Sequence, residues 1–130
     1  MSRTFAAPRF VALGALLAAL AIGLGAFGAH ALKARLGAQQ MGWFETAAHY
    51  HLIHAVALVA VAAAGGALRS PRLLGACAWL LVAGTLLFSG SLYLMAAGAP
   101  RWLGAITPLG GLALICAWLL LAAAAVSSNR

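Results

Sequence analysis

Long apolar stretches alternate along the chain with short polar segments. Four stretches contain no Lys, Arg, Asp or Glu, and they cover residues 10–32, 46–68, 73–100 and 102–129. A helix needs roughly 20 apolar residues to cross a hydrocarbon core of ~30 Å, so each stretch is long enough for one crossing and too short for two. The pattern therefore predicts four membrane-spanning helices, near residues 9–29, 43–67, 71–97 and 107–126.

The stretches are typical of helices rather than of barrel strands. They are continuously apolar and rich in Ala and Leu, whereas barrel strands alternate in polarity over about 10 residues. Pro71 follows Ser70 and Pro108 follows Thr107. Ser or Thr before a proline is a helix start signal, which supports the boundaries of the third and fourth spans.

The connection between the first two spans, residues 30–42, has an amphipathic pattern. Leu32, Leu36 and Met41 share one face if this segment is helical, and the polar side chains lie away from it. This pattern predicts a short helix lying on the membrane surface. A polar loop that happens to contain two leucines is the alternative.

Composition agrees with a membrane protein of a single domain, residues 1–130. Hydrophobic residues make up 65% of the chain and charged residues only 7%, which excludes a cytosolic enzyme and a disordered tail. The net charge of +7 does not indicate nucleic-acid binding, because the basic residues are spread singly or in pairs between apolar runs. We therefore expect an all-α, integral membrane four-helix bundle whose partner is the lipid bilayer, with no nucleic acid.

The distribution of basic residues predicts the orientation. With four spans, the two termini and the second connection lie on one side of the membrane. That side carries Arg3, Arg9, Arg69, Arg72 and Arg130, and the other side carries Lys33, Arg35 and Arg101. The excess of basic residues predicts cytoplasmic N- and C-termini in a bacterial inner (plasma) membrane.

Small residues indicate close helix packing. Gly14 and Ala21 in the first span, Gly84 in the third and Gly110 in the fourth would let helices approach each other. Residues 23–28 match the dinucleotide-binding pattern G-x-G-x-x-G, but they end a membrane helix and do not follow a strand. We therefore interpret these glycines as packing residues, with Gly28 loosening the helix end.

The only acidic residue, Glu45, lies at the start of the second span. His49 follows one helical turn later on the same face, whereas Tyr50 and His54 share a nearly opposite face. His30 closes the first span at a similar depth. A proton or metal site, or a haem held by His30 and His54, is one interpretation. We favour the other, in which these groups bond between helices and Glu45 neutralises Lys33 or Arg35.

A polar stripe of Thr85, Ser89 and Tyr93, each four residues apart, runs along the third span. It could line a path for a small molecule, but hydrogen bonding between helices is the simpler interpretation. No nucleophile, base and acid occur in a catalytic arrangement, so we expect no enzyme activity and no cofactor.

Four local strings carry a family resemblance. They are Gly-Ala-Phe-Gly-Ala-His-Ala-Leu-Lys at 25–33, Phe-Glu-Thr-Ala-x-x-Tyr-x-x-x-His-Ala at 44–55, Phe-Ser-Gly-Ser-Leu-Tyr at 88–93 and Ile-Thr-Pro-Leu-Gly-Gly at 106–111. Together they resemble the domain of unknown function 423 family of small membrane proteins. The resemblance implies four spans but supplies no mechanism. The matching positions are Gly25, Gly28, His30, Phe44, Glu45, Tyr50, His54, Ser89, Gly90, Tyr93, Pro108, Gly110 and Gly111.

Three functions are compatible with these features. We favour a structural or accessory protein that assembles with itself or with a larger membrane complex. A small proton-coupled transporter or channel that uses Glu45 and nearby histidines is the alternative, and a haem- or metal-binding subunit is a weaker one. The candidate functional cluster consists of His30, Glu45, Tyr50, His54, Ser89 and Tyr93.

Overall fold

The computed structural model describes residues 7–129, and within them the chain forms helices and turns with no strand. The elements are α1 (Ala7–Phe27), the π-helix η1 (Gly28–Leu32), α2 (Ala38–Ala64), α3 (Pro71–Ala96), the 3-10 helix η2 (Arg101–Ala105) and α4 (Thr107–Ser128). Four helical segments are long and apolar enough to cross a membrane: Ala7–Leu32, Ala38–Ala64, Pro71–Ala96 and Arg101–Ser128. The predicted all-α fold with four spans is confirmed.

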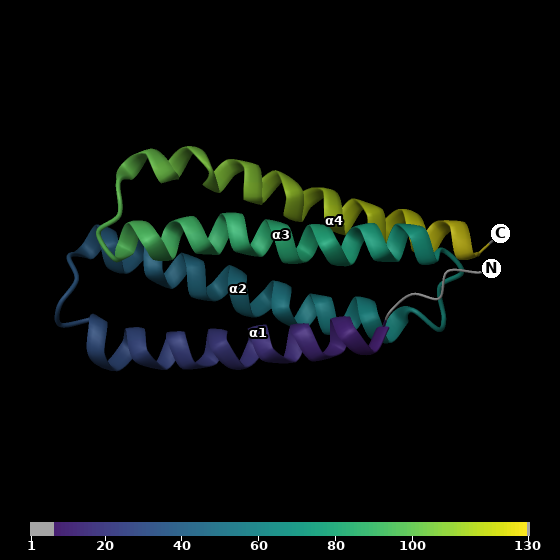
Figure 1. Cartoon of the computed structure of the whole chain (residues 1–130), viewed down its shortest axis with the longest axis horizontal. Helices are drawn as coiled ribbons and strands as arrows, with labels where there is room; N and C mark the ends of the chain where they lie inside the picture. The colour runs from purple at the N-terminus through teal and green to yellow at the C-terminus, as the bar shows by residue number, and fades with distance from the viewer. Residues whose placement is uncertain (1–6, 130) are drawn as a thin grey trace.

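The helices run alternately up and down, and each packs mainly on its neighbour in the sequence (Figure 1). Figure 1 shows α1 and α4 at the two edges and α2 and α3 between them. The start of α1 and the end of α4 lie at the same end of the bundle, as an even number of spans requires. Most buried side chains come from α2 and α3, whereas the edge helices expose large apolar residues such as Leu20 and Leu119.

The helices approach each other closely at Gly14, Gly84 and Gly110, as expected. Gly23 and Gly25, which were also interpreted as packing residues, would have no neighbouring atom within 4 Å of an added Cβ. At Gly14, a Cβ atom would lie 2.7 Å from Val59 Cγ2, so α1 rests directly on α2. At Gly84, a Cβ atom would lie 2.7 Å from Leu114 Cδ2, and one at Gly110 would collide with the backbone of Phe88. The close α3–α4 contact therefore depends on the absence of side chains at Gly84 and Gly110.

The expected surface helix between the first two spans is absent, and this prediction is wrong. The first span continues through η1, in which Lys33 N–H donates to Gly28 O at 3.1 Å. A turn then leads to Gly37, and α2 begins at Ala38. Leu32 and Leu36 are half-buried and line an apolar pocket together with Phe27, Phe44 and Leu94. The spacing of the two leucines therefore belongs to the end of η1 and the turn that leads to α2, not to a surface helix.

The remaining boundaries differ from the sequence-based ones by a few residues. α2 begins at Ala38 and not near 43, because Gln39, Gln40 and Met41 are good helix formers; the Gly37 N–H donates to Gln40 Oε1 at 3.4 Å. α2 ends at Ala64, where two glycines follow and a helix is costly to continue. Pro71 starts α3 as predicted, and α4 starts at Thr107.

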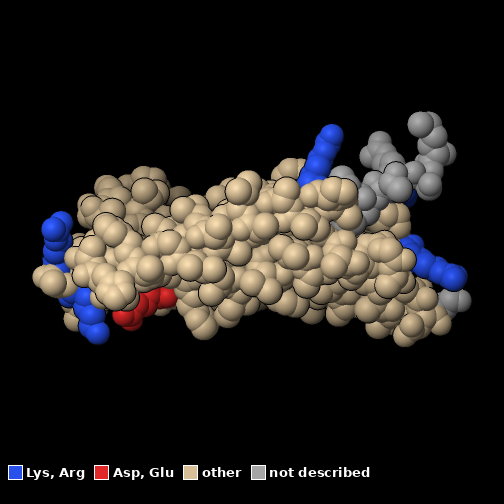
Figure 2. All heavy atoms as spheres, turned by 90° about the horizontal axis from the view of Figure 1, so that it is seen from below, with Lys and Arg blue, Asp and Glu red and all other residues tan. Residues whose placement is uncertain are grey.

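Charged residues lie at the two ends of the bundle. In Figure 2 basic side chains stand at both ends of the visible face, one more projects from its upper edge some way inside the right-hand end, and the central stretch has none. Glu45, the only acidic residue, lies slightly inside one end. This apolar belt between charged ends is what a bilayer requires of a spanning protein. Arg3 and Arg130, used above to predict orientation, lie outside the described residues.

Candidate functional site

His54 of α2 is a buried junction between helices. Its Nδ1 lies 2.7 Å from the carbonyl oxygen of Tyr50, and its Nε2 lies 3.2 Å from the indole Nε1 of Trp118 in α4. A carbonyl only accepts and an indole N–H only donates, so Nδ1 carries the proton and the imidazole is neutral. Tyr50 stacks on the same ring, with centroids 5.9 Å apart and planes 14° apart. Both nitrogens of His54 are therefore used in packing.

Ser89 and Tyr93 join α3 to α2. Ser89 is buried and donates its hydroxyl to the carbonyl oxygen of Ala47 at 2.8 Å. The Tyr93 hydroxyl lies 3.2 Å from Nδ1 of His51, and the Tyr93 ring packs edge-on against Phe44 with centroids 5.2 Å apart. Hydrogen bonding between helices, the simpler interpretation of the α3 stripe, is confirmed for these two residues.

His51 has one nitrogen that is not satisfied. Its Nε2 is buried and forms no hydrogen bond within residues 7–129, although the backbone of Leu17 in α1 lies nearby. The Tyr93 hydroxyl is therefore the hydrogen-bond partner that holds the imidazole in place. The sequence pattern indicated no role for His51, yet this residue connects α2 to α3 more directly than Glu45 does.

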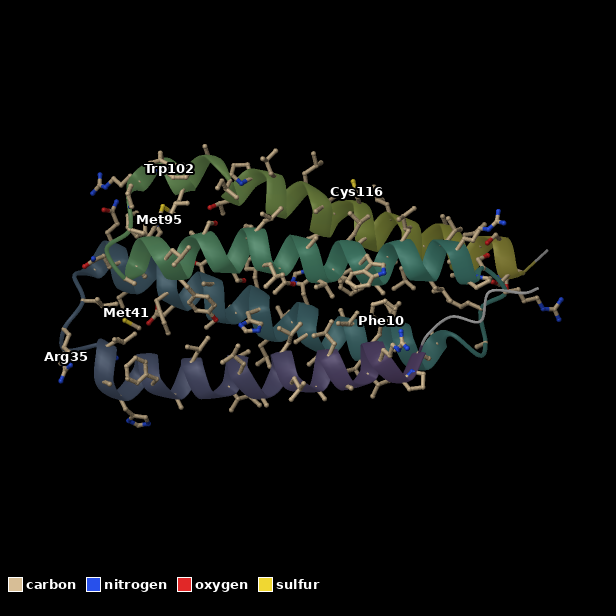
Figure 3. All side chains as sticks on the ribbon, in the orientation of Figure 1. Phe10, Arg35, Met41, Met95, Trp102 and Cys116 are labelled. Atoms are coloured by element: carbon tan, nitrogen blue, oxygen red, sulfur yellow. The ribbon has the colours of Figure 1, made fainter. Side chains whose placement is uncertain are left out.

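Glu45 and His49 line a groove between α1 and α2. The groove has a volume of about 520 Å³, and its wall on the first span includes the small residues Gly25 and Ala26 of α1 and Ala29 of η1. Met41, which lines it as well, lies between α1 and α2 near the turn that contains Arg35 (Figure 3). Both polar side chains are exposed. The groove thus presents a carboxylate and an imidazole to the surroundings of the bundle.

Glu45 has no partner inside the described chain. No hydrogen bond or ion pair of Glu45 occurs within residues 7–129, so the expected neutralisation by Lys33 or Arg35 is not found. Glu45 and His54 lie nine residues apart on α2, and successive residues turn by 100°, so they face nearly opposite sides of the helix. The carboxylate is therefore separated from the buried network around His54.

The predicted cluster is divided among separate places. His54 and Tyr50 face α4 and α3, whereas Ser89 and Tyr93 lie in the α2–α3 interface. Glu45 lies in the α1–α2 groove, and His30 is exposed in η1. Whether these residues have a function beyond packing stays a prediction, but they do not form one site.

The metal and haem interpretations have little geometric support. Among residues 7–129 no three or more His, Cys, Asp or Glu side chains gather closely enough to hold a metal ion. A haem held by His54 would require one of its nitrogens, and both are engaged with Tyr50 and Trp118. Haem binding by His54 would therefore require at least one of these two hydrogen bonds to break.

Sequence reasoning missed several hydrogen bonds to α4, two of which are partly buried. One is the bond from the Trp118 N–H to His54, and an indole N–H within an apolar stretch normally finds such an acceptor. The other bond joins Ser91 of α3 to Thr107, with their hydroxyl oxygens 2.6 Å apart. Ser91 lies off the stripe of Thr85, Ser89 and Tyr93, so periodicity alone did not reveal it.

Comparison with known proteins places the chain in a family. The model of the family described as proteins of unknown function, DUF423, matches residues 24–111. The chain belongs to the DUF423 family. The matched segment begins just before η1 and ends at the glycines of α4, so it contains every residue of the predicted cluster.

Curated relatives of this DUF423 chain are named only as membrane proteins. The UPF0382 membrane protein YwdK of Bacillus subtilis is 44% identical over 117 residues, which cover 90% of this chain and 95% of that protein. The UPF0382 inner membrane protein YgdD of Escherichia coli is 37% identical over 109 residues, covering 84% of this chain and 82% of that protein. No solved structure matches the chain. The chain is thus a membrane protein of a family without a known activity.

Proposed function

We propose that the protein is a non-catalytic accessory component of the membrane that assembles with copies of itself or with a larger membrane complex. The observation that carries this proposal is the exposed Glu45, which has no partner within residues 7–129. The other candidate groups that lie between the helices form bonds within the bundle, so the chemistry available to a partner lies in the α1–α2 groove.

The depth of Glu45 supports a contact with a partner. Glu45 lies seven residues beyond the start of α2, or about 10 Å along a helix of about 40 Å. A hydrocarbon core of ~30 Å centred on α2 would leave Glu45 about 5 Å inside it. An ionisable group at that depth is costly unless it is paired or reaches the interface, which favours an arrangement that supplies a donor.

A second copy could supply that donor. If two copies are inserted in the same direction, their Glu45 ends lie in one leaflet of the bilayer. Lys33 and Arg35 lie in the turn at the Glu45 end, so the basic turn of one copy would be near the carboxylate of the other. The small residues of the groove, such as Ala26 and Ala29, would permit close approach.

Cysteine cross-linking in membranes tests this proposal. In a chain with Cys77→Ser and Cys116→Ser, we expect Ala26→Cys to form a disulfide-linked dimer and Leu112→Cys, exposed at a similar distance from the same end on α4, to form none. Glu45→Gln should reduce the dimer. Stoichiometric capture of one other membrane protein, lost on Glu45→Gln, would instead identify the larger complex. A chain that stays monomeric and captures no partner would overturn the proposal.

A small proton-coupled transporter or channel is the second candidate. It is favoured by one observation, that Glu45 and His49 line the same groove of about 520 Å³. Transport sites usually lie near the midplane, however, and Glu45 lies toward one end. Protein in detergent can be titrated with an organic cation such as tetraphenylphosphonium. A change in the protonation of Glu45 would favour transport over assembly.

We also propose that the protein lies in a bacterial inner membrane with both termini in the cytoplasm. The basic residues predicted on the cytoplasmic side outnumber those at the other end, which carries Lys33, Arg35 and Arg101. The name of the Escherichia coli relative includes the words inner membrane protein. Reporter fusions test the orientation, since a cytoplasmic reporter should be active at both ends of the chain.

A further inference from the structure

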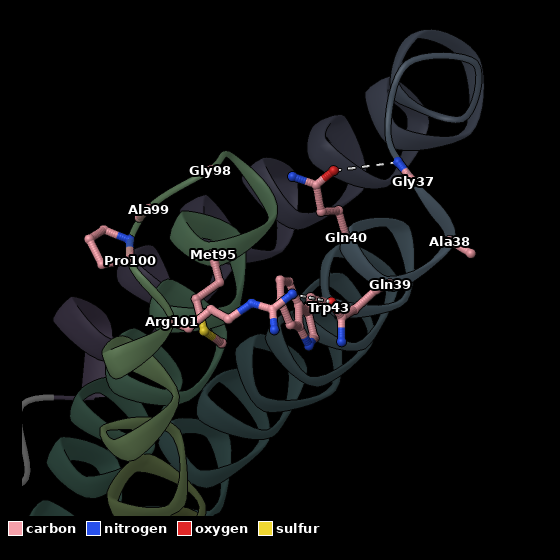
Figure 4. Close-up of a pocket in the computed structure, with 10 residues that line it drawn as sticks. All are labelled: Gly37, Ala38, Gln39, Gln40, Trp43, Met95, Gly98, Ala99, Pro100 and Arg101. Carbon is pink, nitrogen blue, oxygen red and sulfur yellow. Dashed lines mark hydrogen bonds between the residues drawn. The ribbon is translucent and has the colours of Figure 1, made fainter.

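Two cavities meet at the end of the bundle where α2 begins. The first has a volume of about 540 Å³ and lies between the first turns of α2 and the segment that joins α3 to η2. Figure 4 shows Arg101 reaching from that segment toward Gln39 and Trp43 of α2, with Gln40 on the far side. This cavity is therefore lined by a guanidinium and by amide side chains.

The second cavity adjoins the first and is mostly apolar. It has a volume of about 480 Å³ and is lined by Phe88 and Leu92 of α3, by Gly104 of η2 and by Pro108 of α4. Both cavities share three lining residues, which are Trp43, Met95 and Arg101. A polar site at the edge of the membrane thus opens next to an apolar slot between the helices.

Arg101 has capacity for a further ligand. Its Nη2 donates to Gln39 Oε1 at 2.9 Å, and its guanidinium carbon lies 5.9 Å from the centroid of the Trp43 ring. These contacts orient the planar guanidinium, which has five N–H donors in all. No acidic residue lines either cavity, so the positive charge is not compensated there.

We propose that these two cavities form a binding site for an anionic phospholipid. Arg101 binds the headgroup phosphate, with Gln39 and Trp43 holding the guanidinium in position, and an acyl chain lies in the slot beside Phe88 and Leu92. A guanidinium binds phosphate through paired N–H donors, which suits this headgroup. The adjoining apolar slot favours a lipid over a free phosphate ion, because a phosphate ion has no apolar part that could occupy the slot. The site is separate from the Glu45 groove.

Native mass spectrometry of the full chain in mild detergent tests the site. The protein is titrated with phosphatidylglycerol, with phosphatidylcholine of the same chains and with glycerol 3-phosphate, which has no acyl chain. We expect phosphatidylglycerol to bind most tightly. Arg101→Gln should weaken phosphatidylglycerol binding by about tenfold, the size expected for a lost bond to a charged group. Arg72→Gln, an exposed arginine at the opposite end, should leave binding unchanged.

A second variant tests the apolar slot. A Cβ atom at Gly104 would lie 3.6 Å from Met95 Sδ, an ordinary contact, so Gly104→Leu is expected to fold while filling the cavity. It should weaken binding of phosphatidylglycerol but not of glycerol 3-phosphate. Equal binding of phosphatidylcholine, or an Arg101→Gln variant that matches Arg72→Gln, would overturn the proposal. So would glycerol 3-phosphate binding as tightly as the lipid, since that result indicates a phosphate site alone.

Discussion

The indole N–H of Trp118 donates to Nε2 of His54 at 3.2 Å, and this bond ties α4 to α2, two helices that are not neighbours along the chain. It also fixes the neutral form of His54, because a protonated ring would present a donor to another donor. His54 is buried and Trp118 is 46% exposed, so the bond lies at the edge of the bundle and joins a buried ring of α2 to a surface side chain of α4.

Trp118→Phe should destabilise the protein modestly. The substitution removes the N–H and leaves His54 Nε2 without its donor. Hydrogen bonds between membrane helices contribute about 0.6 kcal/mol on average and up to about 1.7 kcal/mol, so we expect a loss in that range in the free energy of unfolding measured in detergent. Trp102→Phe is the matched control, since Trp102 is 67% exposed. Equal losses for both variants would argue that the bond contributes nothing.

Gly110→Ala should be far more damaging than Gly111→Ala. A Cβ atom at Gly110 would collide with the backbone of Phe88, which cannot move aside without separating α3 from α4. At Gly111 the nearest atom, Phe88 Cδ2, would be 3.6 Å away. We expect Gly110→Ala to cost about 1–3 kcal/mol in the free energy of unfolding. Gly111→Ala should leave the free energy of unfolding unchanged or raise it by up to ~1 kcal/mol, because Ala has a higher helix propensity than Gly.

Thermal unfolding of the two glycine variants in the same detergent provides the comparison. If Gly110→Ala matches Gly111→Ala, the close α3–α4 contact is not what holds these helices together.

Hydrophobic patterning predicted the spans because the bilayer imposes a simple length requirement on each of them. The same patterning failed at Leu32 and Leu36. Their spacing suits a surface helix, but it suits equally a turn whose leucines line an apolar pocket beside Phe44 and Tyr93. Only the path of the whole chain distinguishes the two cases. Gly28, whose missing side chain accommodates the Phe44 ring, helps to set that path.

The sequence indicated the positions of the candidate polar residues along the helices, but not which of them lie together. Position on α2 showed that Glu45 and His54 lie on different faces, yet it could not show which helix each face meets. Trp118, which completes the bonding of His54, is 64 residues away in sequence. Arg101 and Gln39 are 62 residues apart, and no local pattern joins them. Contacts of this kind depend on how the helices are arranged around one another.

Tyr93→Phe should remove the side-chain hydrogen bond of the His51 imidazole. The His51 Nε2 atom already has no partner within the described chain, and Nδ1 would lose the Tyr93 hydroxyl. A buried polar group left unsatisfied costs about 1–3 kcal/mol, so we expect a loss of that size in the free energy of unfolding. Replacing both partners, as in His51→Leu with Tyr93→Phe, should recover part of the loss, because the combined change removes the unsatisfied group. If the double variant is less stable than Tyr93→Phe alone, the imidazole has another partner.

Glu45→Gln should leave the stability of the isolated chain nearly unchanged. Since no hydrogen bond or ion pair holds Glu45 within residues 7–129, the substitution removes no contact inside the bundle. Exposed positions of this kind usually shift the free energy of unfolding by no more than about 0.5 kcal/mol. The measurement is thermal unfolding at a protein-to-detergent ratio low enough to keep the chain monomeric.

The same variant, measured where copies can associate, separates two explanations of the carboxylate. If Glu45 neutralised Lys33 or Arg35 of its own chain, Glu45→Gln would lower stability even at high dilution in detergent. If it acts on a partner, stability should fall only under conditions that allow assembly. Lys33→Gln combined with Arg35→Gln should then reproduce the loss of assembly, because these side chains are the proposed donors from the second copy. A double variant that assembles normally while Glu45→Gln does not would show that the donor lies on a different protein.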